Sequence, residues 1–356
     1  MNLTAIRNKL KTAGRCGLLT GLLFLLAAVP QSLQAQTVSG VGTTAASFLK
    51  IGVGARALGM GEAYTTQATD VTALYWNPGA LDRIDNIQMV FNHFDYLADI
   101  YFEYFGAAVP IQNLGTFGIS FSYLGMPDME RTTVMSPDGN GEMVSAHSYA
   151  VNVGFARALT DRFAIGGNVK YVGESIWHAQ ATGFAFDVGL LYRALFRNVK
   201  IGMSITNFGT DMSMQGRDML IQHDISEQYA GNNENINAYL DTDGFPMPVL
   251  FRVGLSANIG RDFFNLEKYD WIVAVDAVHP NDNREYLNVG TEIDVWNALA
   301  LRTGYRQLFL KDREGGFTFG FGVRFNILNT VLNLDYANVD YGRLDHHNKF
   351  SLLFSF

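Results

Sequence analysis

Apolar and polar residues alternate along most of the chain from residue 86 onward. In 184–192, bulky apolar side chains occupy every second position, and small or polar residues such as Asp187 stand between them. The same division recurs over 250–259 and 317–327. Because successive side chains of a β-strand point to opposite faces, this period of two predicts strands with one apolar face and one small or polar face.

The alternation divides into about fourteen predicted strands, each near the length that crosses a bilayer. They cover residues 87–97, 101–110, 116–124, 146–158, 163–176, 182–194, 199–208, 248–260, 269–278, 285–296, 298–308, 316–327, 330–341 and 348–356. Short turns alternate with longer connections, of which 125–145 and 209–247 are rich in Asp, Asn, Gly and Met. This arrangement is typical of an all-β fold, a transmembrane antiparallel β-barrel of the outer membrane.

The first 35 residues have the features of a cleavable export signal. Its basic residues are Arg7, Lys9, Lys11 and Arg15. The apolar run from Leu18 to Val29 is too short for a single transmembrane helix, and Ala35 is a suitable cleavage site. We therefore expect a signal peptide at 1–35, a separate N-terminal segment at 36–86 and a barrel at 87–356.

Composition narrows the possible functions. The net charge is −8 and no basic stripe is present, which argues against nucleic acid as a partner. The only cysteine, Cys16, lies inside the expected signal, so a mature chain would have no disulfide and no cysteine-based metal site.

No motif of catalysis stands out, and we expect a protein without enzymatic activity or cofactor. Gly-x-Ser-x-Gly and His-Glu-x-x-His are absent from the sequence. His346 and His347 fit a surface turn better than a metal site, because no third ligand accompanies them. Residues 52–57 loosely match a dinucleotide-binding fingerprint, with Asp70 downstream, but the required βαβ unit is missing.

Residues 36–86 do not alternate and are rich in glycine and other small residues. We expect two short helices in this segment, at 61–68 and 70–75. Asp70 would cap the second helix, and Asn77-Pro78 would end it.

Within this segment, residues 48–81 carry a specific resemblance. They read Phe-Leu-x-Ile-Gly-x-Gly-Ala-Arg-x-x-Gly-Met-Gly-x-Ala and later Asp-x-x-Ala-Leu-Tyr-Trp-Asn-Pro, which resembles the PorV/PorQ family, itself similar to FadL-type fatty-acid channels. The motif residues are Gly52, Gly54, Arg56, Gly59, Met60, Gly61, Asp70, Trp76, Asn77 and Pro78. Gly79 departs from the pattern, since FadL-like proteins usually have alanine after Asn-Pro.

The resemblance implies a fourteen-stranded barrel whose N-terminal segment folds into the lumen as a hatch. It also implies a non-enzymatic role in type IX protein secretion, as a cargo shuttle or a subunit of an attachment complex. Its partners would be outer-membrane lipid, the barrel-insertion machinery, and a secretion translocon or cargo protein. The alternative is a FadL-like channel for uptake of hydrophobic small molecules, which would need an apolar pocket near the hatch.

Lone charged residues on the small or polar strand faces would point into the lumen. They are Asp187, Arg252, Asp276, Glu292, Arg302 and Arg324. Arg56 would pair with a lumen carboxylate such as Asp187, Asp276 or Glu292. Two interpretations stay open: the charges neutralise one another and plug the barrel, or they serve a ligand or a gate.

Two further features concern partners. The 209–247 loop contains an apolar run formed by Met212, Met214, Met219, Leu220 and Ile221. Flexible methionines suit adaptable contact surfaces, so this run is a candidate docking element, although the loop could equally fold over its own barrel mouth.

The chain stops on Phe356 after an alternating stretch, which resembles the signal read by the barrel-insertion machinery.

Overall fold

The computed structural model describes residues 40–96, 99–224, 235–266, 269–311, 313 and 315–356. The expected signal peptide at 1–35 lies outside the described residues. The described residues form one compact unit. Among the described residues, no helix combines the length and the apolar character needed to cross a membrane.

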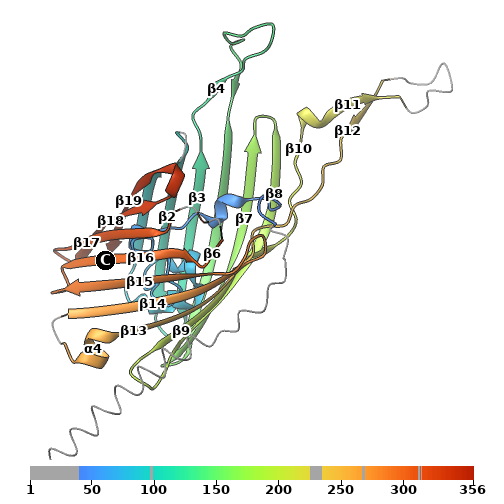
Figure 1. The fold of residues 1–356 in the computed structure, drawn as a ribbon. Helices are drawn as coiled ribbons and strands as arrows, with labels where there is room; N and C mark the ends of the chain where they lie inside the picture. Colours follow the sequence, from blue (N-terminus) through green and yellow to red (C-terminus); the bar gives the residue numbers. More distant parts are fainter. Residues whose placement is uncertain (1–39, 97–98, 225–234, 267–268, 312, 314) are drawn as a thin grey trace, which may run out of the picture. The chain divides into compact units, whose positions relative to one another are not determined.

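Fourteen long strands form a closed antiparallel β-barrel in the described part of the chain (Figure 1). They are β1 (Gln88–Asp95), β2 (Tyr101–Ile111), β3 (Gly115–Gly125), β6 (Ala146–Thr160), β7 (Phe163–Ile176), β8 (Ala179–Arg193), β9 (Lys200–Gly209), β13 (Leu250–Asn258), β14 (Tyr269–Pro280), β15 (Tyr286–Val295), β16 (Leu299–Leu308), β17 (Phe317–Ile327), β18 (Thr330–Asp340) and β19 (His346–Ser355). The predicted fold class is confirmed, and the strands differ from the predicted ones only near their ends.

The first and last strands close the barrel. β1 pairs with β19 from Gln88 opposite Ser355 to His93 opposite Phe350. Every other long strand pairs with its neighbours in chain order. Among the described strands, the register shifts at three places, between Ala158 and Thr160 on β6, between Phe186 and Val188 on β8, and between Leu287 and Val289 on β15.

The two faces of the strands differ as the alternation predicts. On β8, Phe184, Phe186 and Val188 point outward and are about half exposed, whereas Ala185 and Asp187 are buried on the inner face. Exposed bulky residues recur in the same way around the other strands. A continuous apolar outer surface of this kind suits contact with lipid.

The connections between the strands are of two kinds, short turns at one rim of the barrel and longer loops at the other. Turns such as 296–298 and 328–329 are short, and α4 (Ile259–Phe264) occupies the one short-side connection that is longer than its neighbours. On the other rim, the loop after β3 contains β4 (Met129–Glu130) and β5 (Met143–Val144). The loop after β9 contains β10 (Gln215–Gly216), η3 (Arg217–Met219), β11 (Leu220–His223) and β12 (Ile236–Tyr239), and η4 (Gly342–Leu344) precedes β19.

The N-terminal segment, residues 40–86 in the structure, contains four short helices: η1 (Ser47–Lys50), α2 (Ala55–Gly59), α3 (Ala73–Trp76) and η2 (Pro78–Arg83). The expected helix at 61–68 was wrong, since these residues form turns. Gly61 and Glu62 both have φ of 63°, a left-handed conformation that interrupts a helix. The second helix begins at Ala73 rather than at 70, because Asp70 accepts a hydrogen bond from Thr72 N in the preceding turn.

This N-terminal segment packs against the inner face of the barrel. Tyr64, Leu74 and Trp76 are fully buried and belong to the main hydrophobic core. Leu74 lies against two strand glycines, Gly118 on β3 and Gly154 on β6, where an added Cβ atom would lie 3.0 and 2.6 Å from its methyl groups. The lumen is therefore filled by the chain's own N-terminal residues at this level.

Candidate functional site

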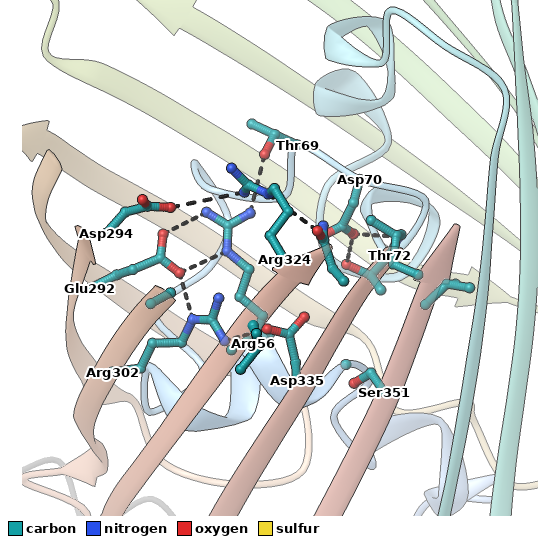
Figure 2. Close-up of a pocket in the computed structure, with 18 of the residues that line it drawn as sticks. Arg56, Thr69, Asp70, Thr72, Glu292, Asp294, Arg302, Arg324, Asp335 and Ser351 are labelled. Carbon is teal, nitrogen blue, oxygen red and sulfur yellow. Dashed lines mark hydrogen bonds and ion pairs between the residues drawn. The ribbon is translucent and has the colours of Figure 1, made fainter. Parts of the chain in front are cut away.

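A charged cavity of about 190 Å³ lies between α2 and the strands of the C-terminal half (Figure 2). Its lining includes Arg56 from α2, Glu292 from β15 and Arg302 from β16. Ala298, in the short turn between β15 and β16, also lines it, so the cavity lies toward the short-turn rim.

Arg56 is the central side chain of this cavity. Its Nη2 and Nε donate to the two carboxylate oxygens of Glu292 at 2.7 and 2.8 Å. Glu292 also accepts from Arg302 Nε at 2.6 Å, and Arg302 reaches Asp335 through Nη1. Of the three carboxylates considered from the sequence, Glu292 is thus the partner of Arg56. Bidentate pairs of this type are among the strongest polar contacts, and removing one partner leaves a buried charge uncompensated.

The other two carboxylates hold different partners. Asp276 Oδ2 accepts from the backbone N–H groups of Tyr64 and Thr65, both at 2.8 Å, and so anchors the N-terminal segment to β14. Asp187 pairs with Lys170 at 2.7 Å and accepts from Asn207 N at 2.7 Å. This second cluster joins strands to one another across the register shift of β8.

The two remaining predicted charges differ in their surroundings. Arg252 is buried, donates to Thr206 Oγ1 at 3.1 Å and lies 5.4 Å from the Trp76 ring centre. Arg324 is more open and lies 3.9 Å from Asp294. Arg252 therefore contacts the N-terminal segment through a cation–π interaction, whereas Arg324 contributes to the short-turn rim.

The tryptophan and the asparagine of the motif position the backbone. Trp76 Nε1 donates to Val53 O at 2.9 Å. Asn77 Nδ2 donates to Thr65 O at 2.8 Å and to Leu190 O of β8 at 3.0 Å, and its Oδ1 accepts from Gly79 N. Pro78 follows as the first residue of η2.

Two glycines of the N-terminal segment, Gly61 of the motif and Gly79, lie where the backbone meets the barrel wall. At Gly61, a Cβ atom would fall 2.6 Å from Tyr305 N. At Gly79, it would fall 2.6 Å from Gly189 O of β8. The departure at Gly79 thus has a local reason, because this chain brings the two backbones too close for alanine.

Several buried charges were missed in the sequence. They are Lys170, Asp335, Arg306 and Lys349, each on the inner face of its strand. Strand alternation alone would have found them. Lys349 Nζ lies 3.1 Å from the Phe94 ring centre and has no hydrogen-bond partner in the described part of the chain. Arg306 lies 3.4 Å from Glu62 of the N-terminal segment.

The apolar space next to the N-terminal segment is small. A cavity lined by Phe48, Leu49, Tyr75, Phe102 and Tyr104, among others, has a volume of about 20 Å³. Pockets for small organic ligands usually measure roughly 300 Å³ or more. In this conformation, the cavity is too small for a hydrophobic ligand.

The candidate docking run is divided between two environments. Met212 is buried, exchanges backbone hydrogen bonds with Phe245 and lies next to Met247 at the barrel mouth. Leu220 and Ile221 on β11 are exposed, and Met214 and Met219 are partly buried. The first residue of the run therefore packs on the protein itself, and Leu220 and Ile221 present an apolar surface to the outside.

The structure gives no support to a metal site at the histidines. Within the described residues, no group of three or more His, Cys, Asp or Glu side chains is arranged to hold a metal ion. His346 is exposed at the start of β19.

Phe356, the last residue, is about half exposed, and its N–H donates to Ile87 O at 2.9 Å.

Comparison with known proteins supports the resemblance noted in the sequence. Residues 34–194 match the family model described as type IX secretion system protein PorV. No curated protein sequence matches the chain.

Three solved structures share the fold. The Pseudomonas putida toluene transporter TodX is 15% identical with a TM-score of 0.54, over 85% of this chain and 97% of its own. The CymD monoaromatic hydrocarbon channel is 12% identical with a TM-score of 0.54, over 86% and 98%. The Ralstonia pickettii toluene transporter TbuX is 12% identical with a TM-score of 0.50, over 85% and 97%. The family model thus bears out the resemblance to PorV proteins, and the likeness to the three channels shows a shared barrel fold.

Proposed function

We propose that this PorV-like barrel is a non-enzymatic outer-membrane subunit of a type IX protein secretion system, which acts as a cargo shuttle or as part of an attachment complex. The family match over residues 34–194 carries this proposal. It covers the whole N-terminal motif and the strands from β1 to β8.

The interior of the barrel agrees with a protein-binding role. The N-terminal segment is held by Glu292 through Arg56 and by Asp276 through two backbone N–H groups. A lumen closed by buried ion pairs suits a subunit that works through its exposed loops. The loops on the long-loop rim carry exposed apolar residues, including Val134, Met135, Leu220 and Ile221.

A second candidate function is a channel for hydrophobic small molecules. The fold shared with the hydrocarbon channels TodX and CymD favours it. The small volume of the apolar cavity beside the N-terminal segment disfavours it, because a channel of this type requires an apolar binding site in the lumen.

Affinity purification of the full chain from its native outer membrane tests the proposal. The eluate would be analysed for both proteins and extractable lipids. Secretion-system components or secreted cargo, identified by mass spectrometry and lost when the bait is untagged, are the expected result. An eluate that contains a bound hydrophobic compound and no such protein would reject the secretion role in favour of the channel.

A further inference from the structure

A second cavity, of about 360 Å³, lies at the short-turn rim. Arg83 of η2, Arg193 at the end of β8 and Lys200 at the start of β9 line it. Thr69 lines both this cavity and the one around Arg56. Arg193 and Lys200 flank the short turn between their strands, so both positive charges are placed at the same rim by the backbone.

All three side chains belong to the inside of the barrel. Arg193 continues the inner face of β8, on which Asp187 and Leu191 are buried. Lys200 continues the inner face of β9, on which Ser204 and Thr206 are buried. A ligand would therefore reach this cavity through the aqueous mouth of the barrel rather than from the surrounding lipid.

These three cations outnumber the two carboxylates among the described residues that line the cavity. None of the three forms an ion pair within 4.0 Å of a carboxylate of the described residues. Asp82 and Asp85 line the same cavity, but Asp82 Oδ1 already accepts a hydrogen bond from Ala158 N and Asp85 is exposed.

Arg83 gives the clearest indication that this cavity binds a ligand. Its Nε and Nη2 atoms are buried and have no hydrogen-bond partner among the described residues. Burial and the positive charge of Arg193 lower the pKa of the Arg83 guanidinium, and the carboxylates of Asp82 and Asp85 offset this only in part. Buried donors without a partner are costly, and a guanidinium fork matches the oxygens of a carboxylate or phosphate.

We propose that Arg83, Arg193 and Lys200 form a binding site for a small soluble oxyanion, a phosphate or carboxylate group, at the short-turn mouth of the barrel. The bound anion would offset the repulsion among the three cations and would accept hydrogen bonds from Arg83. The site is separate from the Arg56–Glu292 pair, whose charges are already balanced by direct contact.

Calorimetric titration of the purified full chain in an uncharged detergent tests the site. Sodium phosphate and sodium acetate would be added separately, at constant ionic strength set with chloride. Saturable binding of at least one of the two anions is expected. Arg193→Gln and Lys200→Gln should each weaken that binding about tenfold or more, because each removes a charged partner of the anion.

Two control variants keep the test specific. Arg193→Lys retains the charge and should retain binding. Arg162→Gln removes an exposed positive charge from the neighbouring turn of the same rim, outside the cavity, and should bind like the native chain. Barrel folding of every variant would be checked by its heat-modifiable migration in gels. Absence of saturable binding for both anions, or an equal loss in Arg162→Gln, would overturn the proposal.

Discussion

The guanidinium of Arg56 and the carboxylate of Glu292 meet in a bidentate pair, although 236 residues separate them in the chain. The pair joins α2 of the N-terminal segment to β15 of the barrel wall. Arg302 contacts the same carboxylate, so one buried anion serves two cations. Together with Asp276, which accepts from two backbone N–H groups of the same segment, Glu292 anchors the N-terminal segment to the barrel wall.

Replacement of Glu292 should therefore destabilise the protein strongly. Glu292→Gln leaves Arg56 and Arg302 without their shared counter-charge, and we expect a loss of about 3–5 kcal/mol in the free energy of unfolding. Urea unfolding of the refolded barrel would measure it. Asp294→Asn is the matched control, because Asp294 lies 3.9 Å from Arg324 at a more open position and should cost less than about 1 kcal/mol. Equal losses in the two variants would contradict a special role for Glu292.

The close approach of Gly79 to β8 leads us to expect that a larger residue at this position lowers the stability of the barrel. Gly79→Ala would place a Cβ atom 2.6 Å from Gly189 O, and backbone atoms on both sides must then shift. We expect a loss of about 1–3 kcal/mol in the free energy of unfolding. Gly244→Ala, whose Cβ atom would meet only Asp211 Cβ at 3.3 Å, should change stability little. A neutral effect of Gly79→Ala would mean that the segment and β8 separate easily.

Partner binding should depend on the exposed part of the long loop rather than on Met212. Changing both Leu220 and Ile221 to Ser removes apolar surface from β11 and leaves the buried Met212 in place. Co-purification of the secretion partners should fall on the order of tenfold. Leu328→Ser, at a fully exposed position on the opposite rim, should have no effect. Undiminished co-purification by the double variant would rule out β11 as the docking element.

The last residue should matter for assembly rather than for stability. Phe356→Ala keeps the backbone hydrogen bond to Ile87 and removes a side chain that is about half exposed. We expect less folded barrel in the outer membrane of living cells, with unchanged refolding of the purified chain in detergent. Phe350→Ala, at an equally exposed position on β19, the strand that ends just before Phe356, is the control. Equal assembly of the two variants would argue against Phe356 as an insertion signal.

Much of the fold could be predicted from local pattern. Phe184, Phe186 and Val188 alternate with Ala185 and Asp187, and a period of two identifies both the strand and its two faces without knowledge of any distant residue. The same pattern predicts that Asp276, Glu292 and Arg302 face inward. Helices in the N-terminal segment were placed less well, because positive φ at Gly61 and Glu62 arises from packing against the barrel.

The sequence by itself determined the strands, their inward charges and the N-terminal motif, since each depends on neighbours in the chain. Only the tertiary structure decided that Arg56 meets Glu292 rather than Asp187 or Asp276, because pairing across the lumen depends on strand register and on where the segment lies. The same holds for Gly79 against Gly189 and for the grouping of Arg83 with Arg193 and Lys200. Closure of the barrel sets those distances, and no local pattern records them.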